Sequence, residues 1–182
     1  NIKYIKEQAF SSCTQLTHIL FDESPSDSNL EFIGSKAFEY TSIQNFLSVP
    51  FDLSRIDEGC FMHCNNLLNV NLTCQLDAIS SNCFLNCTKL QSIVLPPNLT
   101  SIGNSAFKHC ASISKISLPE SLYEIGDFAW MQCTGLTQIN LPANLAKIGQ
   151  SSFALCSKLL IPAQFPEQLI SIGAFAFANC LI

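Results

Sequence analysis

Cysteines and histidines are the residues of this 182-residue chain that could support a reaction, a metal site or a covalent cross-link. The chain contains ten cysteines and three histidines. Seven of the cysteines share one position of a pattern that recurs about every 23 residues, and they are Cys13, Cys64, Cys87, Cys110, Cys133, Cys156 and Cys180. This spacing leaves three interpretations: disulfides, a metal site, or a ladder of buried free thiols.

We favour the ladder of free thiols. Stacked parallel coils lie about 4.8 Å apart, so neighbouring cysteines would be close enough to form disulfides. Parallel side chains, however, do not readily reach the torsion of about 90° that a disulfide needs. Thr41 occupies the cysteine position in one repeat, and threonine can fill the space and donate a hydrogen bond but cannot form a bridge. Disulfides within the array stay as an alternative.

A zinc site is the second alternative. Cys60 and Cys64 are separated by three residues, as are Cys83 and Cys87, and four thiolates are a common zinc ligand set. Cys60 and Cys83, however, stand where other repeats have alanine, which indicates small core side chains. We therefore predict no metal and no cofactor. Cys74 lies outside the repeated position, near the end of an expected strand, and is predicted to be the most exposed thiol.

Nucleophilic catalysis is the third chemistry to test. His63 directly precedes Cys64 and His109 directly precedes Cys110, so each pair combines a nucleophile with a base. Neighbours in sequence usually point in different directions, and the repeat alone explains the adjacency. No phosphate-binding loop or other catalytic motif accompanies these pairs. We predict that the protein is not an enzyme.

A 23-residue repeat must position these side chains. Isoleucines mark it at Ile33, Ile56, Ile79, Ile102, Ile125 and Ile148, and an aromatic residue follows each of them after five positions. The segment 136–142, LTQINLP, alternates apolar and polar residues as a strand does, whereas 151–156, SSFALC, resembles one helical or 3-10 turn. The sequence predicts an α/β-type solenoid of about 7–8 coils, with short parallel strands on one face and short helical or 3-10 turns on the other. The polar segment 22–29 reads as an insertion.

The repeat unit resembles a known family. The segment 136–156, LTQINLPANLAKIGQSSFALC, is similar to the BspA-like, or Treponema pallidum-type, leucine-rich repeat, with Ser152 in place of the usual alanine. Thr41 and Thr73 depart from the pattern at its cysteine and proline positions. The resemblance covers essentially residues 1–182, which we interpret as one solenoid, a fragment of a longer protein truncated at both ends.

The resemblance implies a function in recognition. Members of the BspA-like family are cell-surface proteins of anaerobic bacteria and protist parasites, which implies adhesion to host or cell-surface components and an extracellular location. An intracellular leucine-rich-repeat scaffold or effector is the alternative, and reduced cysteines would favour it. A net charge of −5 and nine scattered Lys and Arg residues argue against nucleic acid. No apolar run reaches the roughly 18–20 residues of a membrane span, and exposed solenoid ends allow homo-oligomers.

The outward strand positions form the candidate binding face. The first predicted column is His18, Phe46, Asn69, Ser92, Lys115 and Gln138, and the second is Leu20, Ser48, Asn71, Val94, Ser117 and Asn140. Leu68 joins His18, Leu20 and Phe46 in a predicted apolar patch, and such patches often mark protein contacts. Sequons predict possible glycosylation at Asn71, Asn86 and Asn98.

Overall fold

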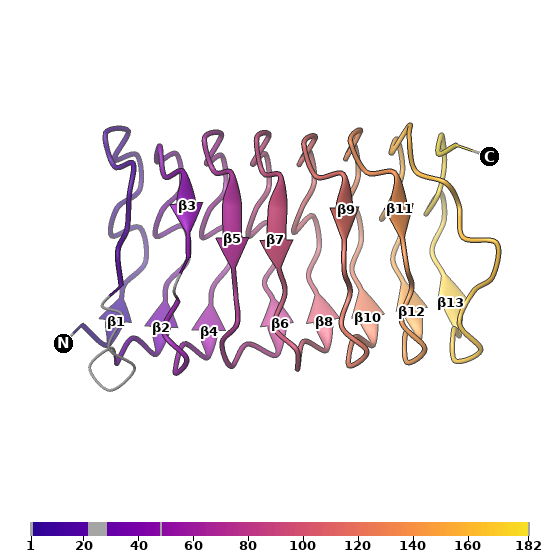
Figure 1. Ribbon diagram of the computed structural model, residues 1–182, viewed down its shortest axis with the longest axis horizontal. Helices are drawn as coiled ribbons and strands as arrows, with labels where there is room; N and C mark the ends of the chain where they lie inside the picture. The colour runs from indigo at the N-terminus through magenta and orange to yellow at the C-terminus, as the bar shows by residue number, and fades with distance from the viewer. Residues whose placement is uncertain (1, 22–28, 48, 182) are drawn as a thin grey trace.

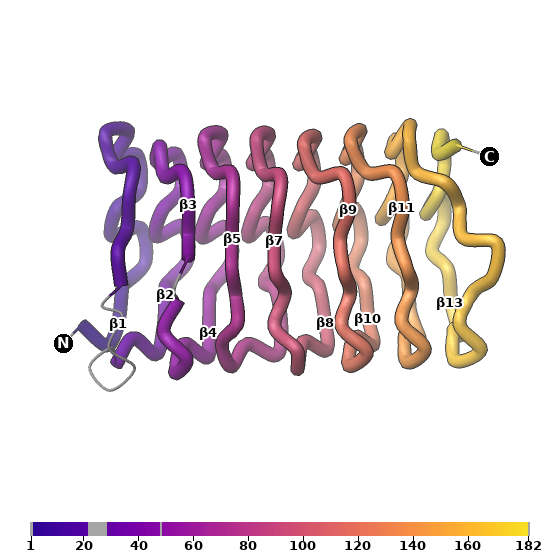
Figure 2. Tube along the Cα trace, viewed as in Figure 1, coloured from indigo at the N-terminus to yellow at the C-terminus, as the bar shows by residue number. Residues whose placement is uncertain are grey.

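The computed structural model describes residues 2–21, 29–47 and 49–181. Through these residues the chain winds into a solenoid whose coils stack along one axis, from the indigo coil near the N-terminus to the yellow coil near the C-terminus (Figures 1 and 2). Each interior coil contributes strands to two rows that run along the whole stack (Figure 1). The predicted solenoid of short parallel strands is therefore confirmed.

The first row contains the isoleucine anchors. It forms two parallel sheets, with strand orders β1-β2-β4 and β6-β8-β10-β12-β13. Its strands are β1 (Tyr4–Ile5), β2 (Phe32–Ile33), β4 (Arg55–Ile56), β6 (Ala78–Ile79), β8 (Ser101–Ile102), β10 (Glu124–Ile125), β12 (Lys147–Ile148) and β13 (Ser171–Ile172). Within each sheet, each isoleucine pairs with the isoleucine of the neighbouring coil, as Ile102 does with Ile125. Side chains alternate across a strand, so this register aligns the isoleucines in one inward column.

The second row contains the strands of the candidate binding face. It comprises β3 (Asn45–Phe46), β5 (Asn69–Asn71), β7 (Ser92–Val94), β9 (Lys115–Ile116) and β11 (Gln138–Ile139). These strands form one sheet of order β3-β5-β7 and a separate pair, β9 and β11. We call the outward side of this row the strand face. A proline follows most of these segments and ends them, because it has no N–H to donate to the ladder.

The expected helical or 3-10 face is wrong, because no helix occurs in the part of the chain that the structure describes. Each coil instead turns through two residues with positive φ placed four apart, for example Ser105 (55°) and His109 (63°). A left-handed residue interrupts a right-handed helix. Between them, Phe107 donates its N–H to the Ala129 carbonyl of the next coil at 2.8 Å, whereas Lys108 donates within its own coil to Ser105 at 3.2 Å. Bonding between coils thus replaces helical bonding.

Stacked aromatic rings fill the core beside these turns. The rings lie 5.2–5.5 Å apart between centroids, with interplanar angles of 14° or less. The column consists of Phe10, Phe38, Phe61, Phe84, Phe107, Trp130, Phe153 and Phe177. Offset stacking of this kind adds to the burial of the rings. The aromatic position of the repeat is therefore its main packing contact between coils.

Gly149 allows neighbouring coils to approach closely beside the isoleucine column. A Cβ at this position would lie 2.5 Å from the carbonyl carbon of Gly126 and 2.6 Å from the backbone nitrogen of Asp127. Backbone cannot rotate out of the way as a side chain can, so we expect Gly149→Ala to lower the free energy of unfolding by about 1–3 kcal/mol. Urea unfolding followed by circular dichroism measures this change.

Ser80 supplies the matched control for Gly149. It stands in the same repeat position three coils earlier, directly after Ile79, and its Cβ is already accommodated there. Ser80→Ala adds no atom and removes only the hydrogen bond that the hydroxyl donates to the Ile56 carbonyl. We expect this change to cost about 1 kcal/mol or less. Equal losses in Gly149→Ala and Ser80→Ala would show that close approach of the coils is not the cause.

Candidate functional site

The first outward column of the strand face is set by the strand register. His18 bridges to Asn45, Asn45 pairs with Asn69, and Asn69 pairs with Ser92. Lys115 and Gln138 form the corresponding pair between β9 and β11. The structure therefore aligns His18, Asn69 and Ser92 in the predicted column and places Lys115 beside Gln138.

Phe46 does not belong to this column, and its predicted place on the surface is wrong. Its side chain has 0% exposure, it pairs with the buried Val70, and its ring packs edge-on against Phe61. The distance from Phe46 to its partner Val70 is 24 residues, one more than the usual repeat. Counting back 23 residues from Asn69 therefore selected an inward residue. Asn45, which the sequence analysis missed, takes the outward position.

The second outward column carries the exposed apolar side chains. Leu20 is 91% exposed and Val94 pairs with Asn71, while Ser117 and Asn140 are also exposed. Ser48 lies outside the described residues. Leu47, another residue that the sequence analysis missed, follows Phe46 as Asn71 follows Val70, and it is 44% exposed.

The apolar patch is therefore smaller than predicted. Leu20 and Leu47 are its exposed members, whereas Leu68 is half-buried and Phe46 is part of the core. His18 is exposed, and its Nδ1 lies 2.9 Å from the hydroxyl oxygen of Thr17. A surface of two exposed leucines is too small to identify a binding site by itself.

The strand face is almost free of formal charge. Asn69 donates a side-chain hydrogen bond to Asn45 at 2.8 Å, and Ser92, Gln138 and Asn140 extend this uncharged polar surface. Lys115 is the one formally charged residue among the described residues of the two columns. The ion pairs of the described chain lie elsewhere, at Lys3–Glu31, Arg55–Asp57 and Lys147–Glu124.

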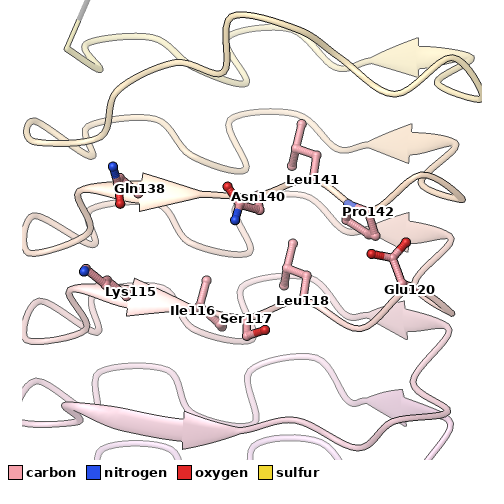
Figure 3. A pocket seen from close by; sticks show the side chains of 9 residues that line it. All are labelled: Lys115, Ile116, Ser117, Leu118, Glu120, Gln138, Asn140, Leu141 and Pro142. Carbon is pink, nitrogen blue, oxygen red and sulfur yellow. The ribbon is translucent and has the colours of Figure 1, made fainter.

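A shallow hollow of about 420 Å³ opens on the strand face between β9 and β11. The side chains that line it are Lys115, Ile116, Ser117, Leu118, Glu120, Gln138, Asn140, Leu141 and Pro142 (Figure 3). Lys115 and Gln138 lie at one end, and Glu120 and Pro142 lie at the other (Figure 3). Four of these residues, Lys115, Ser117, Gln138 and Asn140, belong to the predicted binding face, and Glu120 was not among its candidates.

The number of strand pairs explains why the hollow forms at this place. β5 and β7 are joined by three residue pairs, and Leu72 adds a hydrogen bond from its N–H to the Val94 carbonyl at 2.9 Å. β9 and β11 are joined by two pairs only. Pro119 and Pro142 follow shortly afterwards, and neither can donate to a ladder. The ladder between the two strands therefore ends at Ile116 and Ile139, where the hollow begins.

The repeated cysteines after Cys13 point into the core, and the structure contains them as free thiols. Each of these six thiols donates a hydrogen bond to the carbonyl of the aromatic residue one coil back, as Cys110 does to Phe84 at 3.2 Å and Cys133 to Phe107 at 3.1 Å. Thr41, at the same repeat position, donates instead to the Phe38 carbonyl of its own coil at 2.8 Å. A hydroxyl therefore takes the place of the thiol in one coil.

Exposure differs among the cysteines outside the middle of the ladder. Cys13 is exposed and Cys180 is half-buried. Cys74, predicted to be the most exposed thiol, is only 3% exposed, because it alternates with the exposed Thr73 and Gln75 and so points inward. Burial raises the pKa of the Cys74 thiol to about 11. A buried thiol of raised pKa is a poor nucleophile, so we interpret Cys74 as a side chain that fills the core.

Comparison with known proteins agrees with this geometry. A family model described as the BspA type leucine rich repeat region matches residues 1–98 and 77–182. The chain belongs to the BspA-type leucine-rich repeat family. The match contains six copies, which corresponds to about six turns and does not confirm 7–8 coils. No curated protein matches this BspA-type chain.

Solved structures of bacterial leucine-rich repeat proteins resemble this BspA-type chain. A leucine-rich repeat protein from Bacteroides ovatus is 31% identical with a TM-score of 0.85, over 98% of this chain and 45% of that protein. The Treponema pallidum leucine-rich repeat protein is 28% identical with a TM-score of 0.58, over 70% of each chain. A leucine-rich repeat protein from Eubacterium ventriosum, 16% identical with a TM-score of 0.68, shares the fold over 100% of this chain and 44% of that protein. The chain thus spans less than half of the Bacteroides protein.

His63 and Cys64 do not form a catalytic pair in this BspA-type chain. Cys64 is buried and donates to the Phe38 carbonyl, whereas the His63 ring stacks on Tyr40 at 4.5 Å and its Nδ1 lies 3.1 Å from the Asn86 amide nitrogen. Across residues 2–21, 29–47 and 49–181 no three His, Cys, Asp or Glu side chains gather as metal ligands. No helix in these ranges is long and apolar enough to cross a membrane.

The three predicted glycosylation positions differ in access. Asn98 is exposed at a turn, whereas Asn71 is half-buried on the strand face and its side-chain oxygen is buried without a hydrogen-bond partner. The Asn86 amide contacts His63, and its backbone has positive φ. Of the three, Asn98 is sterically the most favourable acceptor.

Proposed function

We propose that this BspA-type chain is a non-catalytic recognition module that binds proteins through its strand face. The observation that carries the proposal is the register of β5, β7, β9 and β11, which presents mostly uncharged side chains in two columns over several coils. Repeat proteins commonly bind partners across such an extended surface. The buried, hydrogen-bonded thiols offer no nucleophile that would support an enzyme instead.

We further propose that the parent protein acts at the cell surface, in adhesion to host or other cell-surface components. Membership of the BspA-type family supports this location. An intracellular scaffold or effector is the second candidate, and the ten free thiols favour it, because cytosolic proteins keep their cysteines reduced. Antibody labelling of intact, unpermeabilised cells distinguishes the two: labelling supports the surface role, and labelling only after permeabilisation contradicts it.

A substitution in the middle of the strand face tests recognition itself. Ser92 is exposed on β7, and Ser92→Arg would place a long charged side chain over the centre of both columns. We expect proteins that bind the unmodified chain, selected on an array of purified secreted and surface proteins, to lose at least about tenfold in affinity, since both sterics and an unpaired charge oppose contact. Biolayer interferometry measures the affinities.

Ser171→Arg is the matched control. Ser171 is exposed on β13, in the other row of strands, so the same chemical change is made away from the strand face. We expect its affinity for the same proteins to remain unchanged. If Ser92→Arg bound as well as Ser171→Arg, with both variants folded by circular dichroism, the strand face would not be the recognition surface.

A further inference from the structure

We propose that the hollow between β9 and β11 binds an extended peptide segment of the partner, with an acidic side chain on Lys115. This proposal rests on the proposed recognition function and specifies the chemistry of its ligand. Lys115 is the single formal charge in the two described columns of the strand face, on a chain whose net charge is −5. A lone cation in an uncharged surface selects a ligand with one anionic group at that point.

Lys115 is free to accept such a group. It is exposed, and no ion pair or side-chain hydrogen bond engages it in the described part of the chain. Its partner across the strands is the uncharged Gln138. An incoming carboxylate would therefore meet an available ammonium group without displacing a carboxylate of the chain itself. Charge-assisted hydrogen bonds of this type are stronger than those between neutral groups.

The remaining lining fits a polypeptide backbone. Ser117, Gln138 and Asn140 project along the hollow, and their amide and hydroxyl groups can pair with both the N–H and the C=O groups of a peptide (Figure 3). Ile116, Leu118 and Leu141 provide an apolar floor for a side chain. From Lys115 to Glu120 the chain advances five residues, roughly 16 Å if extended, which is the length of about five ligand residues.

Glu120 gives the hollow a direction. It lies at the end opposite Lys115 (Figure 3). One of its carboxylate oxygens accepts a hydrogen bond from the Ala143 N–H at 3.2 Å, which fixes the position of the side chain. A ligand with an acidic residue at one end and a basic residue about five positions away complements both ends.

Other ligand classes fit the hollow less well. Acidic polysaccharides and nucleic acids carry a negative charge on each repeating unit, and a single lysine can neutralise only one of these charges. Stacking on aromatic rings stabilises many flat ligands, and no aromatic side chain lines this hollow. The peptide is therefore the class that the lining favours.

A peptide selection tests this inference. Phage that display random 12-residue peptides would be selected on the 182-residue chain, and the enriched peptides would be synthesised and titrated into ¹⁵N-labelled protein. We expect enriched peptides to contain Asp or Glu, and the chemical shift changes to concentrate at residues 115–120 and 138–142. Lys115→Gln should weaken binding by about tenfold, the effect of removing a charge-assisted hydrogen bond. Lys147→Gln, on the other row of strands, should leave it unchanged.

The outcomes separate this inference from the proposed function. Enriched peptides without acidic residues, or equal binding by Lys115→Gln and the unmodified chain, would overturn the peptide site. If Ser92→Arg still weakened the binding of array-selected proteins, recognition by the strand face would remain supported although the peptide site was overturned. Binding of an acidic oligosaccharide that needs Lys115, with no peptide enriched, would likewise overturn the peptide as ligand.

Discussion

Replacing Phe84 with alanine is expected to lower the free energy of unfolding by about 3–5 kcal/mol. Phe84 is fully buried, and its ring stacks on Phe61 at 5.4 Å and on Phe107 at 5.3 Å between centroids. Truncation removes both stacking contacts and leaves a cavity in the middle of the column. The neighbouring coils cannot close it, because Phe84 donates its N–H to the Ala106 carbonyl and so holds the coil spacing. Urea unfolding measures the loss.

Phe10→Ala is the matched control for this prediction. Phe10 occupies the same repeat position at the first coil, but it is 40% exposed, and among the described residues its ring stacks on Phe38 alone. The Phe10 ring buries less apolar area than the Phe84 ring, so we expect Phe10→Ala to lower the free energy of unfolding by only about 1 kcal/mol. Equal losses for Phe10→Ala and Phe84→Ala would show that stacking from both sides does not hold the solenoid together.

The sequence predicted those parts of the fold in which the same type of side chain recurs at the same position of every coil. The isoleucines, the aromatic residues and the repeated cysteines are spaced as the coils are, so their inward columns could be recognised from periodicity. Thr41 also indicated that this position holds a small hydrogen-bonding side chain and not a bridge: its hydroxyl and the Cys64 thiol of the next coil both donate to the Phe38 carbonyl. These positions repeat because the contact between coils repeats.

The left-handed turns of the coils could not be predicted from the sequence, because almost all of their positive-φ positions are occupied by residues other than glycine. In the part of the chain that the structure describes, fifteen non-glycine residues have positive φ, among them Phe128, Leu155 and Phe175. Such residues normally avoid this conformation, so composition gave no sign of it. The left-handed turns are maintained by hydrogen bonds to the next coil, for example from the Phe128 N–H to the Gln150 carbonyl at 2.8 Å. Only a stack of several coils supplies those acceptors.

The strand face was predicted in part for a similar reason. Lys115, Gln138, Ser117 and Asn140 follow the regular 23-residue spacing, and the structure brings them together around one hollow. Phe46 was misplaced because one coil contains an extra residue, which moves the register by one and exchanges inward and outward side chains. Strand pairing, which no local pattern reveals, was needed to find Asn45 and Leu47.

The buried thiols give the protein an alkaline limit to its stability. Burial raises the pKa of Cys64 to about 11, and it also raises the pKa of Cys83 and Cys110. An unfolded thiol ionises at a pKa of about 8.5. The folded state therefore retains protons that the unfolded state releases. This contribution to stability is fully present below about pH 8.5 and is lost as the pH rises toward about 11.

Each such thiol should steepen the loss of stability by about 1.4 kcal/mol per pH unit within that window. We expect the free energy of unfolding, measured in urea with reductant present, to fall markedly between pH 8 and pH 10.

Cys110→Thr should fold, since Thr41 fills this position elsewhere, and should lose about 1–2 kcal/mol less over the same interval because one thiol is gone. Ile113→Val, a buried change without a titrating group, should lose as much as the unmodified chain. If Cys110→Thr matched Ile113→Val instead, ionisation of the ladder would not be the cause of alkaline unfolding.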